Sequence, residues 1–394
     1  MADISLLYDR SETDELGIRL TAEQIGVELG FLPFYKVSIG FDEGGFSYAS
    51  SSKDFTEELK KTRVVINRAQ SKNRRIYASM FLEAFGKETL NPLTVELSCQ
   101  SKIRTLLEFS KSGVRIPRTV YVPCNPRDAR VGGGQVDNSE TVSDLVVRQL
   151  EDEKVVVKPD EGTHGRGVIL AEDHERLREV LSNLRPSLTS PVGVVAQEYV
   201  PKWFYDLRII VEKVKGRRAL CHPTAMARGG FGDFRTNAHL KNMVFRVNLP
   251  ENIREDAVSC ANALGKASEA WVVALDAMPR IGDELIHGED ELREAFSYLD
   301  PYFQDVVKVK LNPRKLWDFR SYTAEVEGAY SRYMEADEYA RISATITDTL
   351  NRASGFVCFH EGNACPEFWE QTRIVGGVNI AEALLRSAES LLDS

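Results

Sequence analysis

The stretch VVVKPDEGTHGRGVIL, residues 155–170, combines the residue types that phosphate binding needs. A β-rich run delivers Lys158, and Gly162, Gly165 and Gly167 follow within a few positions. Glycines let a backbone approach phosphate oxygens and present N–H groups with no Cβ in the way. A lysine beneath them supplies a compact positive charge. The stretch predicts a lid over phosphate groups, although such a pattern taken alone is more often a hairpin without a ligand.

A second candidate site is the segment HEGNACPEF near the C-terminus. Glu361 and Asn363 are two residues apart on an expected strand, so their side chains share one face. A carboxylate and an amide oxygen suit a hard cation such as Mg²⁺. The expected strand VVALDAM adds Asp276, and Asp348 on an expected helix is the competing acid. His360 alternates with Glu361, and we expect it to face the core, away from the metal.

Two further motifs place arginine two residues from another polar side chain. Asp206 and Arg208 lie in DLR, and Arg235 and Asn237 lie in GDFRTN. Each pair is expected on one face of a strand, where the arginine could neutralise an anion. Arg228, followed by two glycines, is a further candidate for this role. Ordinary surface ion pairs are the alternative for either motif alone.

Composition narrows the class of protein. The chain has 394 residues, of which 43% are hydrophobic and 28% charged, and its net charge is −9. These values predict a globular protein of two or three subdomains and argue against a nucleic-acid binder. No apolar run approaches the roughly 20 residues that span a bilayer, and the N-terminus lacks a secretory pattern. Six scattered cysteines without a CxxC pair indicate reduced thiols, so we expect a cytoplasmic protein. The net charge and the lack of a membrane-spanning run lead us to expect that it binds neither nucleic acid nor membrane.

Hydrophobic periodicity predicts the elements that position these motifs. Alternating strands and helices over residues 1–120 predict a parallel α/β domain. Gly113 is the expected C-cap of the last helix of this part, and 124–141, rich in Gly, Asn, Asp and Pro, is an expected loop. The predicted strands are 3–8, 37–39 and 64–67, and the predicted helices are 21–30, 75–86 and one within 90–113.

The rest of the chain mixes strands and helices differently. Strands at 196–201 and 206–228 are expected to pair antiparallel, and 279–340 is acidic, aromatic and helical in period. We expect an N-terminal α/β domain at 1–95, a central lid domain at 96–200, and a C-terminal domain at 201–394 that includes an insertion at 279–352. The other predicted elements are helices at 142–151, 173–184, 253–270 and 378–392 and strands at 271–278 and 355–368.

The order of these motifs resembles that of the ATP-grasp superfamily, specifically the RimK-type and LysX-type carboxylate–amine ligases. The resemblance runs from residue 1 to about 278 and resumes at about 353. It implies an α/β (α+β) ATP-grasp fold with an N-terminal parallel α/β (pre-ATP-grasp) domain and a helical insertion. The insertion departs from the family, which has a short turn there; a helical lid, an oligomer contact and a partner-docking segment are the alternatives. The motifs, in order, are Lys102, Lys158, the glycine loop, QEYV, DLR, RTN, Asp276 and EGN.

The resemblance also implies a role for each matched residue. Lys102 and Lys158 would contact nucleotide phosphates, and Asp206 would lie near the ribose. Asp276, Glu361 and Asn363 would bind the metal, while Arg235, Asn237 and Arg228 would act at the reacting phosphate. The implied lid residues are Gly162, Thr163, His164, Gly165 and Gly167, and the implied hinge residues that frame adenine are Gln197, Glu198, Tyr199 and Val200.

The implied activity is ATP-dependent amide formation through an acyl phosphate, with Mg²⁺, or Mn²⁺ in its place, as cofactor. The carboxylate substrate would be glutamate or a similar amino acid, and the amine acceptor a small molecule, a peptide or an acidic carrier protein. A small-molecule kinase and a non-catalytic ATP-binding module are the alternatives, and a homodimer is the expected oligomer. Arg208 and the basic cluster of Arg68, Arg74 and Arg75 are candidates for binding an anionic substrate, with a solvated loop as the alternative for the cluster.

Overall fold

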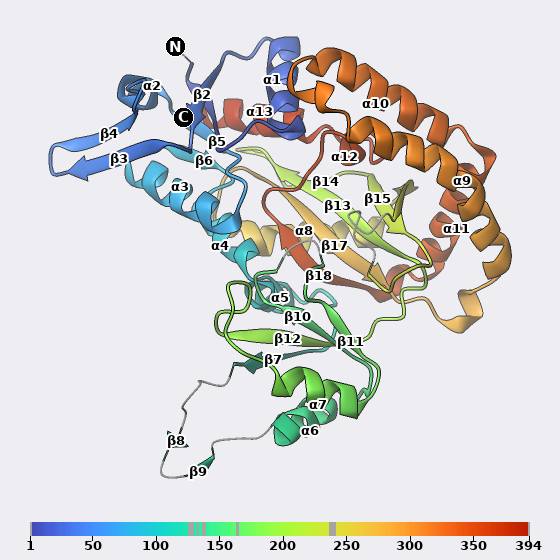
Figure 1. The fold of residues 1–394 in the computed structure, drawn as a ribbon. Helices are drawn as coiled ribbons and strands as arrows, with labels where there is room; N and C mark the ends of the chain where they lie inside the picture. Colours follow the sequence, from blue (N-terminus) through green and yellow to red (C-terminus); the bar gives the residue numbers. More distant parts are fainter. Residues whose placement is uncertain are drawn as a thin grey trace.

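The computed structural model describes residues 2–124, 130–131, 134–135, 139–162, 165–235 and 242–392. Figure 1 shows a small N-terminal sheet, a larger central sheet, and a separate lobe that carries the glycine hairpin. Both chain ends lie beside the N-terminal sheet (Figure 1). No helix in the described part of the chain is long and apolar enough to cross a membrane.

The N-terminal unit is a four-stranded parallel sheet in the order β2-β1-β5-β6. Its two central strands are almost entirely buried, as both faces of a parallel sheet usually are. This confirms the predicted parallel α/β architecture. The elements are β1 (Ile4–Tyr8), α1 (Thr13–Ile25), β2 (Leu29–Pro33), α2 (Thr56–Lys61), β5 (Val64–Asn67), α3 (Lys72–Ala84), β6 (Glu88–Leu90) and α4 (Leu93–Gln100).

Two predictions for this unit were wrong in detail. The helix expected at 21–30 is α1, which begins at Thr13 because Glu12 and Glu15 form a capping box. It ends before Gly26, whose φ of 79° is easily reached only without a Cβ. The strand expected at 37–39 belongs to β3 (Val37–Asp42), which pairs only with β4 (Gly45–Ser50) in an antiparallel hairpin that projects from the parallel sheet (Figure 1).

The lid lobe is an antiparallel sheet in the order β11-β10-β12-β7. Two helices cover one face of this sheet through a separate hydrophobic cluster that includes Val146, Val157 and Leu177. The helix α5 connects the lobe to the rest of the chain. The elements are α5 (Lys102–Lys111), β7 (Thr119–Pro123), β8 (Arg130–Val131), β9 (Gly134–Gln135), α6 (Ser139–Leu150), β10 (Val155–Pro159), β11 (Ile169–Ala171), α7 (His174–Ser182) and β12 (Gly193–Glu198).

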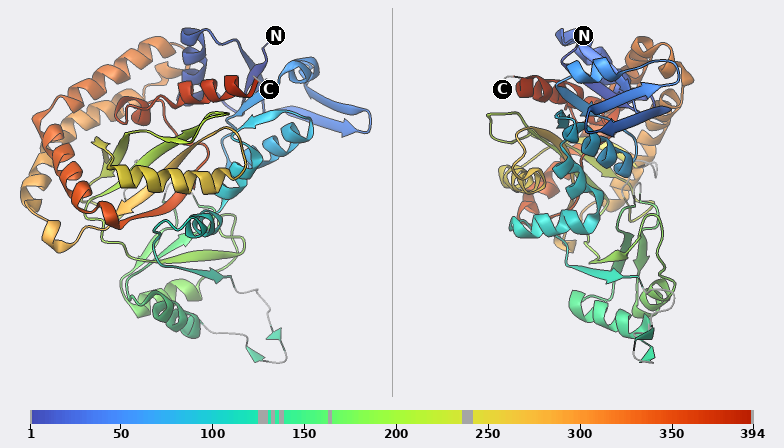
Figure 2. Two further views of the ribbon diagram at one scale, coloured as in Figure 1. Left: turned by 180° about the vertical axis from the view of Figure 1, so that it is seen from behind. Right: turned by 90° about the vertical axis from the view of Figure 1, so that its left-hand side faces the viewer.

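The central sheet is antiparallel in the order β16-β15-β13-β17-β18, and β14 pairs with β13. One face, with Ile209 and Leu275, packs on α8, which Figure 2 shows lying along the sheet. The other face, with Ile210 and Ala274, packs on α13 and the N-terminal unit. The elements are β13 (Tyr205–Lys213), β14 (Leu220–Cys221), β15 (Thr224–Gly229), β16 (Met243–Asn248), α8 (Glu251–Gly265), β17 (Trp271–Pro279), β18 (Val357–Asn363), α12 (Gln371–Ile374) and α13 (Ile380–Leu392).

The segment between β17 and β18 is helical, as predicted. It forms α9 (Glu289–Lys310), α10 (Phe319–Met334) and α11 (Asp337–Arg352). These helices pack against the edge strand β16: the ring of Phe245 lies 5.5 Å from that of Phe296, and the Tyr333 hydroxyl donates to the Val244 carbonyl at 3.0 Å. The insertion therefore extends the hydrophobic core of the central sheet.

Candidate functional site

A cavity of about 880 Å³ lies between the lid lobe, the central sheet and the N-terminal unit. Side chains that are far apart in the sequence converge on it. The predicted site residues that line it are Arg68, Arg75, Lys102, Lys158, Gly162, Gly165, Glu198, Tyr199, Val200, Asp206, Arg208, Arg228, Arg235, Asp276, Glu361 and Asn363.

The remaining predicted residues divide into two groups. Gly167, Gln197 and Arg74 do not line the cavity. Gln197 instead donates from Nε2 to the Thr119 hydroxyl at 2.9 Å. The competing acid Asp348 pairs with Arg352 at 3.0 Å on an exposed face of α11, away from the cavity. Thr163, His164 and Asn237 lie outside the described residues.

Two lysines reach the cavity from the lid lobe and α5. Lys102 Nζ donates to the Gly162 carbonyl at 2.6 Å and lies 4.0 Å from the Glu361 carboxylate. Burial lowers the pKa of Lys102, and it lowers the pKa of Lys158 to about 8, with Lys102 adding to the shift and Glu361 opposing it. An anion placed between these ammonium groups would favour their charged forms.

Asp160, which the sequence analysis did not assign, connects the lid lobe to α5. Its Oδ1 accepts from the Ser101 hydroxyl and from the Ile103 N–H, both at 2.9 Å. The carboxylate thus satisfies an N–H in the first turn of α5. This contact holds the N-terminus of α5, and with it Lys102, against the end of β10. The proline and acid after Lys158 were visible in the sequence, but their partner on α5 was not.

Two features of the hairpin require glycine: its close approach to Pro159 and its positive φ angles. A Cβ on Gly167 would lie 2.8 Å from Pro159 Cγ, and one on Gly162 would lie 3.0 Å from Pro159 Cβ. Gly165 and Gly167 have φ values of 69° and 72°, which side-chain-bearing residues rarely adopt. Arg166, between them, lines the cavity. The glycines therefore permit a tight turn over Pro159 and expose backbone to the cavity.

The segment after β12 enters the cavity beside a fixed carboxylate. Glu198 accepts from the Arg118 N–H at 3.0 Å and pairs with the Arg118 and Arg280 guanidinium groups at 3.1 and 3.0 Å. Burial would raise the pKa of Glu198, but these contacts lower it below its usual value. The Glu198 side chain is thus held by arginines, and the N–H groups of Glu198 and Tyr199 donate to the Arg118 and Lys154 carbonyls, both at 3.1 Å. The adenine-framing role of residues 197–200 stays a prediction.

A buried ladder of ion pairs crosses the central sheet. Arg228 Nε and Nη2 bind the two oxygens of Asp206 at 2.8 and 2.9 Å, and Nη2 also lies 3.2 Å from Asp276. Arg208 binds Asp276 at 2.9 and 3.0 Å. Burial would raise the pKa of Asp276, but Arg208 and Arg228 hold it well below its usual range. Asp276 is therefore ionised, and as a metal ligand it would have to share its oxygens with two guanidinium groups.

Strand β18 presents Glu361 and Asn363 to the cavity, as their spacing predicts. Burial would raise the pKa of Glu361, but Lys102 and Lys72 lower it, so the carboxylate is charged. Asn363 Nδ2 is covered by protein and has no hydrogen-bond partner among the described residues. The expectation that His360 faces the core is wrong, because a β-bulge between β17 and β18 turns it toward the cavity as well.

Mg²⁺ fits this donor set. It prefers carboxylate and amide oxygens and is usually held by one or two carboxylates together with phosphates and water. Glu361 and Asn363 would hold it, with Asp276 opposite Glu361 in the strand register. In the described part of the chain, no three His, Cys, Asp or Glu side chains are grouped to hold a metal by themselves.

Arg235 extends toward the lid from the other side of the cavity. Its guanidinium pairs with Asp233 at 2.7 and 2.9 Å, and Nη1 donates to the Gly165 carbonyl at 3.3 Å. The hydrogen bond with Asp233 raises the pKa of Arg235 further above its ordinary value. The predicted transition-state cation is thus placed at the lid, with a carboxylate that fixes its orientation.

Lys202 is a cavity residue that the sequence analysis missed. It lies two residues after QEYV, and burial lowers its pKa to about 8, with Asp206 opposing the shift and Arg228 adding to it. The only sequence signal was its position between two motifs that were recognised. Further basic residues that line the cavity are Arg10 and Lys72 of the N-terminal unit and Lys310 and Lys315 of the insertion.

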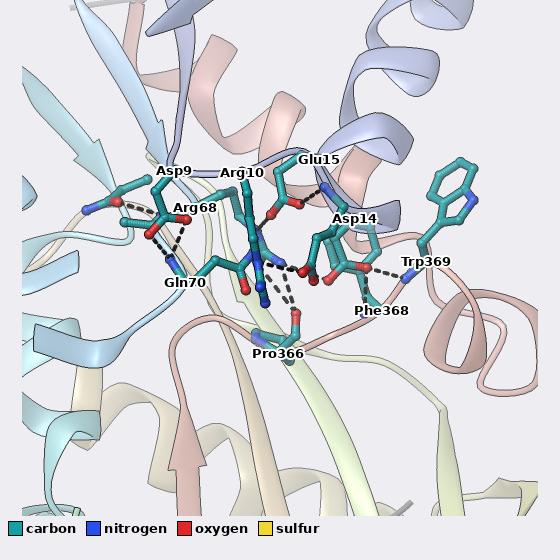
Figure 3. A network of polar contacts seen from close by, with 12 residues as sticks. Asp9, Arg10, Asp14, Glu15, Arg68, Gln70, Pro366, Phe368 and Trp369 are labelled. Atoms are coloured by element: carbon teal, nitrogen blue, oxygen red, sulfur yellow. Dashed lines mark hydrogen bonds and ion pairs between the residues drawn. The ribbon is translucent and has the colours of Figure 1, made fainter. Parts of the chain in front are cut away.

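The basic cluster expected to bind substrate is engaged with protein carboxylates. Arg68 pairs with Asp14 at 2.8 Å and Glu15 at 3.4 Å and donates to the Pro366 carbonyl at 3.4 Å, a network drawn in Figure 3. Arg75 pairs with Glu96 at 2.9 Å. Arg74 is half exposed and contacts Asp9 at 3.2 Å. The role of this cluster in substrate binding stays a prediction.

The Asp14 carboxylate joins the N-terminal unit to the C-terminal segment. It accepts from the Phe368 and Trp369 N–H groups at 3.1 and 2.8 Å (Figure 3). Burial raises the pKa of Asp14 to about 7, Arg68 opposes this shift, and Glu15 adds to it. The network of Arg68, Asp14 and Glu15 therefore connects two segments more than 350 residues apart in the chain, as the separation of 355 between Asp14 and Trp369 shows.

Comparison with known proteins agrees with this geometry. Residues 125–286 match the family model of the RimK-like ATP-grasp domain. The chain is 25% identical over 263 residues to the alpha-aminoadipate–LysW ligase LysX of Sulfurisphaera tokodaii, which covers 66% of this chain and 81% of that protein. It is 32% identical over 188 residues to a probable alpha-L-glutamate ligase of Xanthomonas oryzae, covering 47% of this chain and 56% of the relative. The chain thus spans about half the length of the glutamate ligases it matches.

Solved structures share the architecture over the whole chain. A Chryseobacterium gregarium RiPP-associated ATP-grasp ligase superposes with a TM-score of 0.55 at 14% identity, covering 100% of this chain and 97% of the other. The D-alanine–D-alanine ligase of Bacillus anthracis, solved with ATP, gives 0.53 at 12% identity, covering 99% and 97%. At this identity the likeness shows the fold alone. With the cavity between its lid and central sheet, this chain has the ATP-grasp fold, and residues 125–286 are similar to the RimK-like ATP-grasp domain.

Proposed function

We propose that the protein is an ATP-dependent carboxylate–amine ligase that forms an amide bond and releases ADP and phosphate. The observation that carries the proposal is the cavity itself. Lys102 and Lys158 line it together with Glu361 and Asn363, and Arg235 donates to the Gly165 carbonyl at the lid. This arrangement suits a nucleotide triphosphate with a divalent cation, because cations and metal-binding oxygens both converge where phosphates would lie.

The proposed reaction has two steps. A carboxylate oxygen of the substrate attacks the γ-phosphorus of ATP, the bond to the ADP oxygen breaks, and an acyl phosphate forms. The amine nitrogen then attacks the acyl carbon, the bond to the phosphate oxygen breaks, and the nitrogen gives up a proton as the amide forms. When bound, Mg²⁺ would neutralise phosphate charge.

The chain's own residues would act by binding and positioning. Lys102 and Lys158 would bind phosphate oxygens, and the glycine hairpin would cover them and exclude water. Arg235 would neutralise charge on the transferred phosphoryl group, since its guanidinium is held at the lid by Asp233. Because Arg228 is held by Asp206 and Asp276, we propose that it supports the site by fixing these two carboxylates.

We propose the substrate class from the substrates named for the relatives and from the basic residues that line the cavity. The named relatives act on α-aminoadipate and glutamate, both amino acids with a second carboxylate. We propose a substrate of this class, with an amine on a small molecule, a peptide or a carrier protein as acceptor. Lys72 and Lys315 also line the cavity and would bind the second carboxylate. From the sequence we also propose that the protein is cytoplasmic and forms a homodimer.

The proposal is tested by measuring ADP release from the purified protein with Mg²⁺, ATP, amino dicarboxylates and pooled amine acceptors. ADP and phosphate formed in step with an amide, identified by mass spectrometry, would support it. A stable phosphorylated product would instead show a kinase. Nucleotide binding without turnover on any substrate would support a binding module.

A further inference from the structure

Strand β18 departs from regular pairing where it enters the cavity. Leu275 lies opposite Gly362 and Asp276 opposite Glu361, but the next residue, Ala277, lies opposite Phe359. His360 is therefore the extra residue of a β-bulge. In a regular strand only one of two consecutive side chains can face the cavity. At a bulge two consecutive residues oppose one, and both can turn to the same side.

The contacts of the neighbouring residues show that the bulge has this effect. Phe359 is fully buried, and its ring lies 6.5 Å from that of Phe109 on the core side. Gly362 also faces the core, since a Cβ there would lie 2.7 Å from Leu264 Cδ1. His360 and Glu361 are both half-buried and both line the cavity. The strand thus presents a continuous polar strip of His360, Glu361 and Asn363.

Two members of the polar strip lack the partners that buried polar atoms normally have. His360 Nε2 and Asn363 Nδ2 are covered by protein, yet neither has a hydrogen-bond partner among the described residues. Buried polar groups in folded proteins are nearly always hydrogen-bonded, and an exception calls for a ligand, an ion or a functional role. Both residues flank Glu361. Nε2 of a neutral imidazole can bind a cation, whereas Asn363 Nδ2 is an N–H donor that needs an acceptor, so this amide would bind a cation only through Oδ1.

Charged groups of both signs act on the imidazole. Lys158 has the largest single effect, and Asp276, Glu361 and Asp206 act with the opposite sign. Asp276 is already occupied by Arg208 and Arg228. His360 therefore lies on β18 beside Glu361 and carries a nitrogen, Nε2, that has no hydrogen-bond partner among the described residues.

We propose that His360 supplies an imidazole nitrogen to the divalent cation bound by Glu361 and Asn363, so that the site binds Mn²⁺ in preference to Mg²⁺. The inference rests on the proposed function, because it assumes that a metal–nucleotide complex enters the cavity. Mg²⁺ is selected by oxygen donors, whereas imidazole suits transition metals, and Mn²⁺ accepts both kinds of donor. A mixed nitrogen and oxygen donor set would thus shift the metal preference.

The direct test is pulsed electron paramagnetic resonance of Mn²⁺ bound to the full chain with β,γ-methylene-ATP. Protein labelled with ¹⁵N-histidine should show a ¹⁵N coupling to Mn²⁺. The coupling should disappear in His360→Leu and persist in His222→Asn. His222 is a matched control, because its Nε2 is also covered and makes no hydrogen bond in the described chain, although it lies 3.7 Å from Glu212, and His222 does not line the cavity.

The thermodynamic test compares metal affinities in the same complex. His360→Leu should weaken Mn²⁺ binding by about tenfold or more, as loss of a metal-supporting group does, while Mg²⁺ binding changes far less. His360→Asn, which offers an amide oxygen, should reduce the ratio of Mn²⁺ to Mg²⁺ affinity in the same direction. Equal losses for both metals would overturn the inference.

The outcomes separate this inference from the proposed function. Mn²⁺ and nucleotide binding without ¹⁵N coupling would overturn the role of His360 and leave the ligase proposal intact. Failure of the wild-type protein to bind the nucleotide analogue with either metal would overturn both. If His360→Leu does not fold, the labelled wild-type protein and His222→Asn still decide the question, because a coupling absent from both would refute direct ligation.

Discussion

Arg68 and Arg75 of the N-terminal unit line the same cavity as the polar strip on β18, but the polar groups of the two regions are satisfied differently. Arg68 and Arg75 are only 5% and 6% exposed, and each is paired with protein carboxylates. On β18, Glu361 has Lys102 only at 4.0 Å, and atoms of both His360 and Asn363 lack partners in the described chain. Both regions are rich in polar groups, yet only the β18 strip has capacity left for a ligand.

This difference separates groups that hold the fold together from groups that can bind substrate. When one partner of a buried, hydrogen-bonded ion pair is removed, the other charge is left without compensation. The fold is then strongly destabilised. A buried polar group without a partner is costly in the free protein and gains when a ligand satisfies it. We therefore expect substitutions in the first region to affect stability and those in the second to affect binding and turnover.

The largest effect is expected from Arg68→Ala. It leaves Asp14 and Glu15 buried without their cation, so the free energy of unfolding should fall by about 3–5 kcal/mol. The loss should be smaller at pH 6 than at pH 8, because the pKa of Asp14 is already about 7 and would rise further without Arg68. Urea denaturation measures the change. A raised KM with unchanged stability would instead show that Arg68 binds substrate.

The next largest effect is expected from Glu361→Gln. The substitution keeps the shape of the side chain and removes the charge for a cation, so ADP release should fall by about a thousandfold with little change in stability. Asp348→Asn is the matched control. Asp348 was the competing acid, but it pairs with Arg352 outside the cavity and should be dispensable. Loss of ADP release in Asp348→Asn without loss in Glu361→Gln would mean that the metal ligand is assigned to the wrong residue.

Arg235→Ala should slow turnover by roughly a hundredfold while leaving nucleotide affinity nearly unchanged, because the guanidinium is expected to act on charge that develops during phosphoryl transfer. Single-turnover ADP formation and equilibrium binding of β,γ-methylene-ATP measure the two quantities separately. Arg235→Lys should recover only part of the rate, since an ammonium cannot bind Asp233 with the same two-point geometry. Near-normal turnover in Arg235→Ala would refute this role.

A smaller effect is expected from pH, through Lys158 and Lys202. Burial lowers the pKa of each to about 8, and phosphate should raise it again, so nucleotide binding should take up protons near pH 8 and almost none near pH 6. Calorimetry in buffers of different ionisation enthalpy measures the uptake.

The lowered pKa values of Lys158 and Lys202 also predict how the stability of the ligand-free protein changes with pH. The unfolded chain, with lysine pKa near 10.5, binds more protons than the folded chain above pH 8. The contribution of these lysines to stability should therefore rise with pH from about 8 to 10.5. Lys158→Met should reduce both the proton uptake and this rise; a variant with unaltered uptake would contradict the assignment.

The smallest effect is expected from Arg74→Ala. Its side chain is 49% exposed and its contact with Asp9 is 3.2 Å, so stability should change by less than about 1 kcal/mol. Arg74→Glu tests the predicted substrate role without disturbing the core, because Arg74 is the most exposed arginine of the cluster. A KM for the carboxylate substrate that does not rise would remove Arg74 from the list of substrate-binding residues.

Much of this protein is readable from the order of residues along the chain. The strand–lysine–glycine pattern at 155–170 and the two-residue spacing of Glu361 and Asn363 depend only on local geometry, and both are placed at the cavity as expected. Helical periodicity predicted the helices of the insertion for the same reason. The start of α1 at Thr13 is set by a capping box, and its two residues, Glu12 and Glu15, were a sequence signal that the predicted helix did not use.

Other features depend on partners that are distant in the sequence. The pairing of Asp276 with Arg208 and Arg228, of Arg68 with Asp14, and of Asp160 with Ser101 exists only once segments far apart in the sequence are folded together. The direction of His360 is set by a bulge, which depends on the register between two strands that are separated by the whole insertion. The sequence alone determined which residues are chemically capable. Tertiary structure decided which of them are already satisfied, because only packing brings opposite charges together or leaves a buried group without a partner.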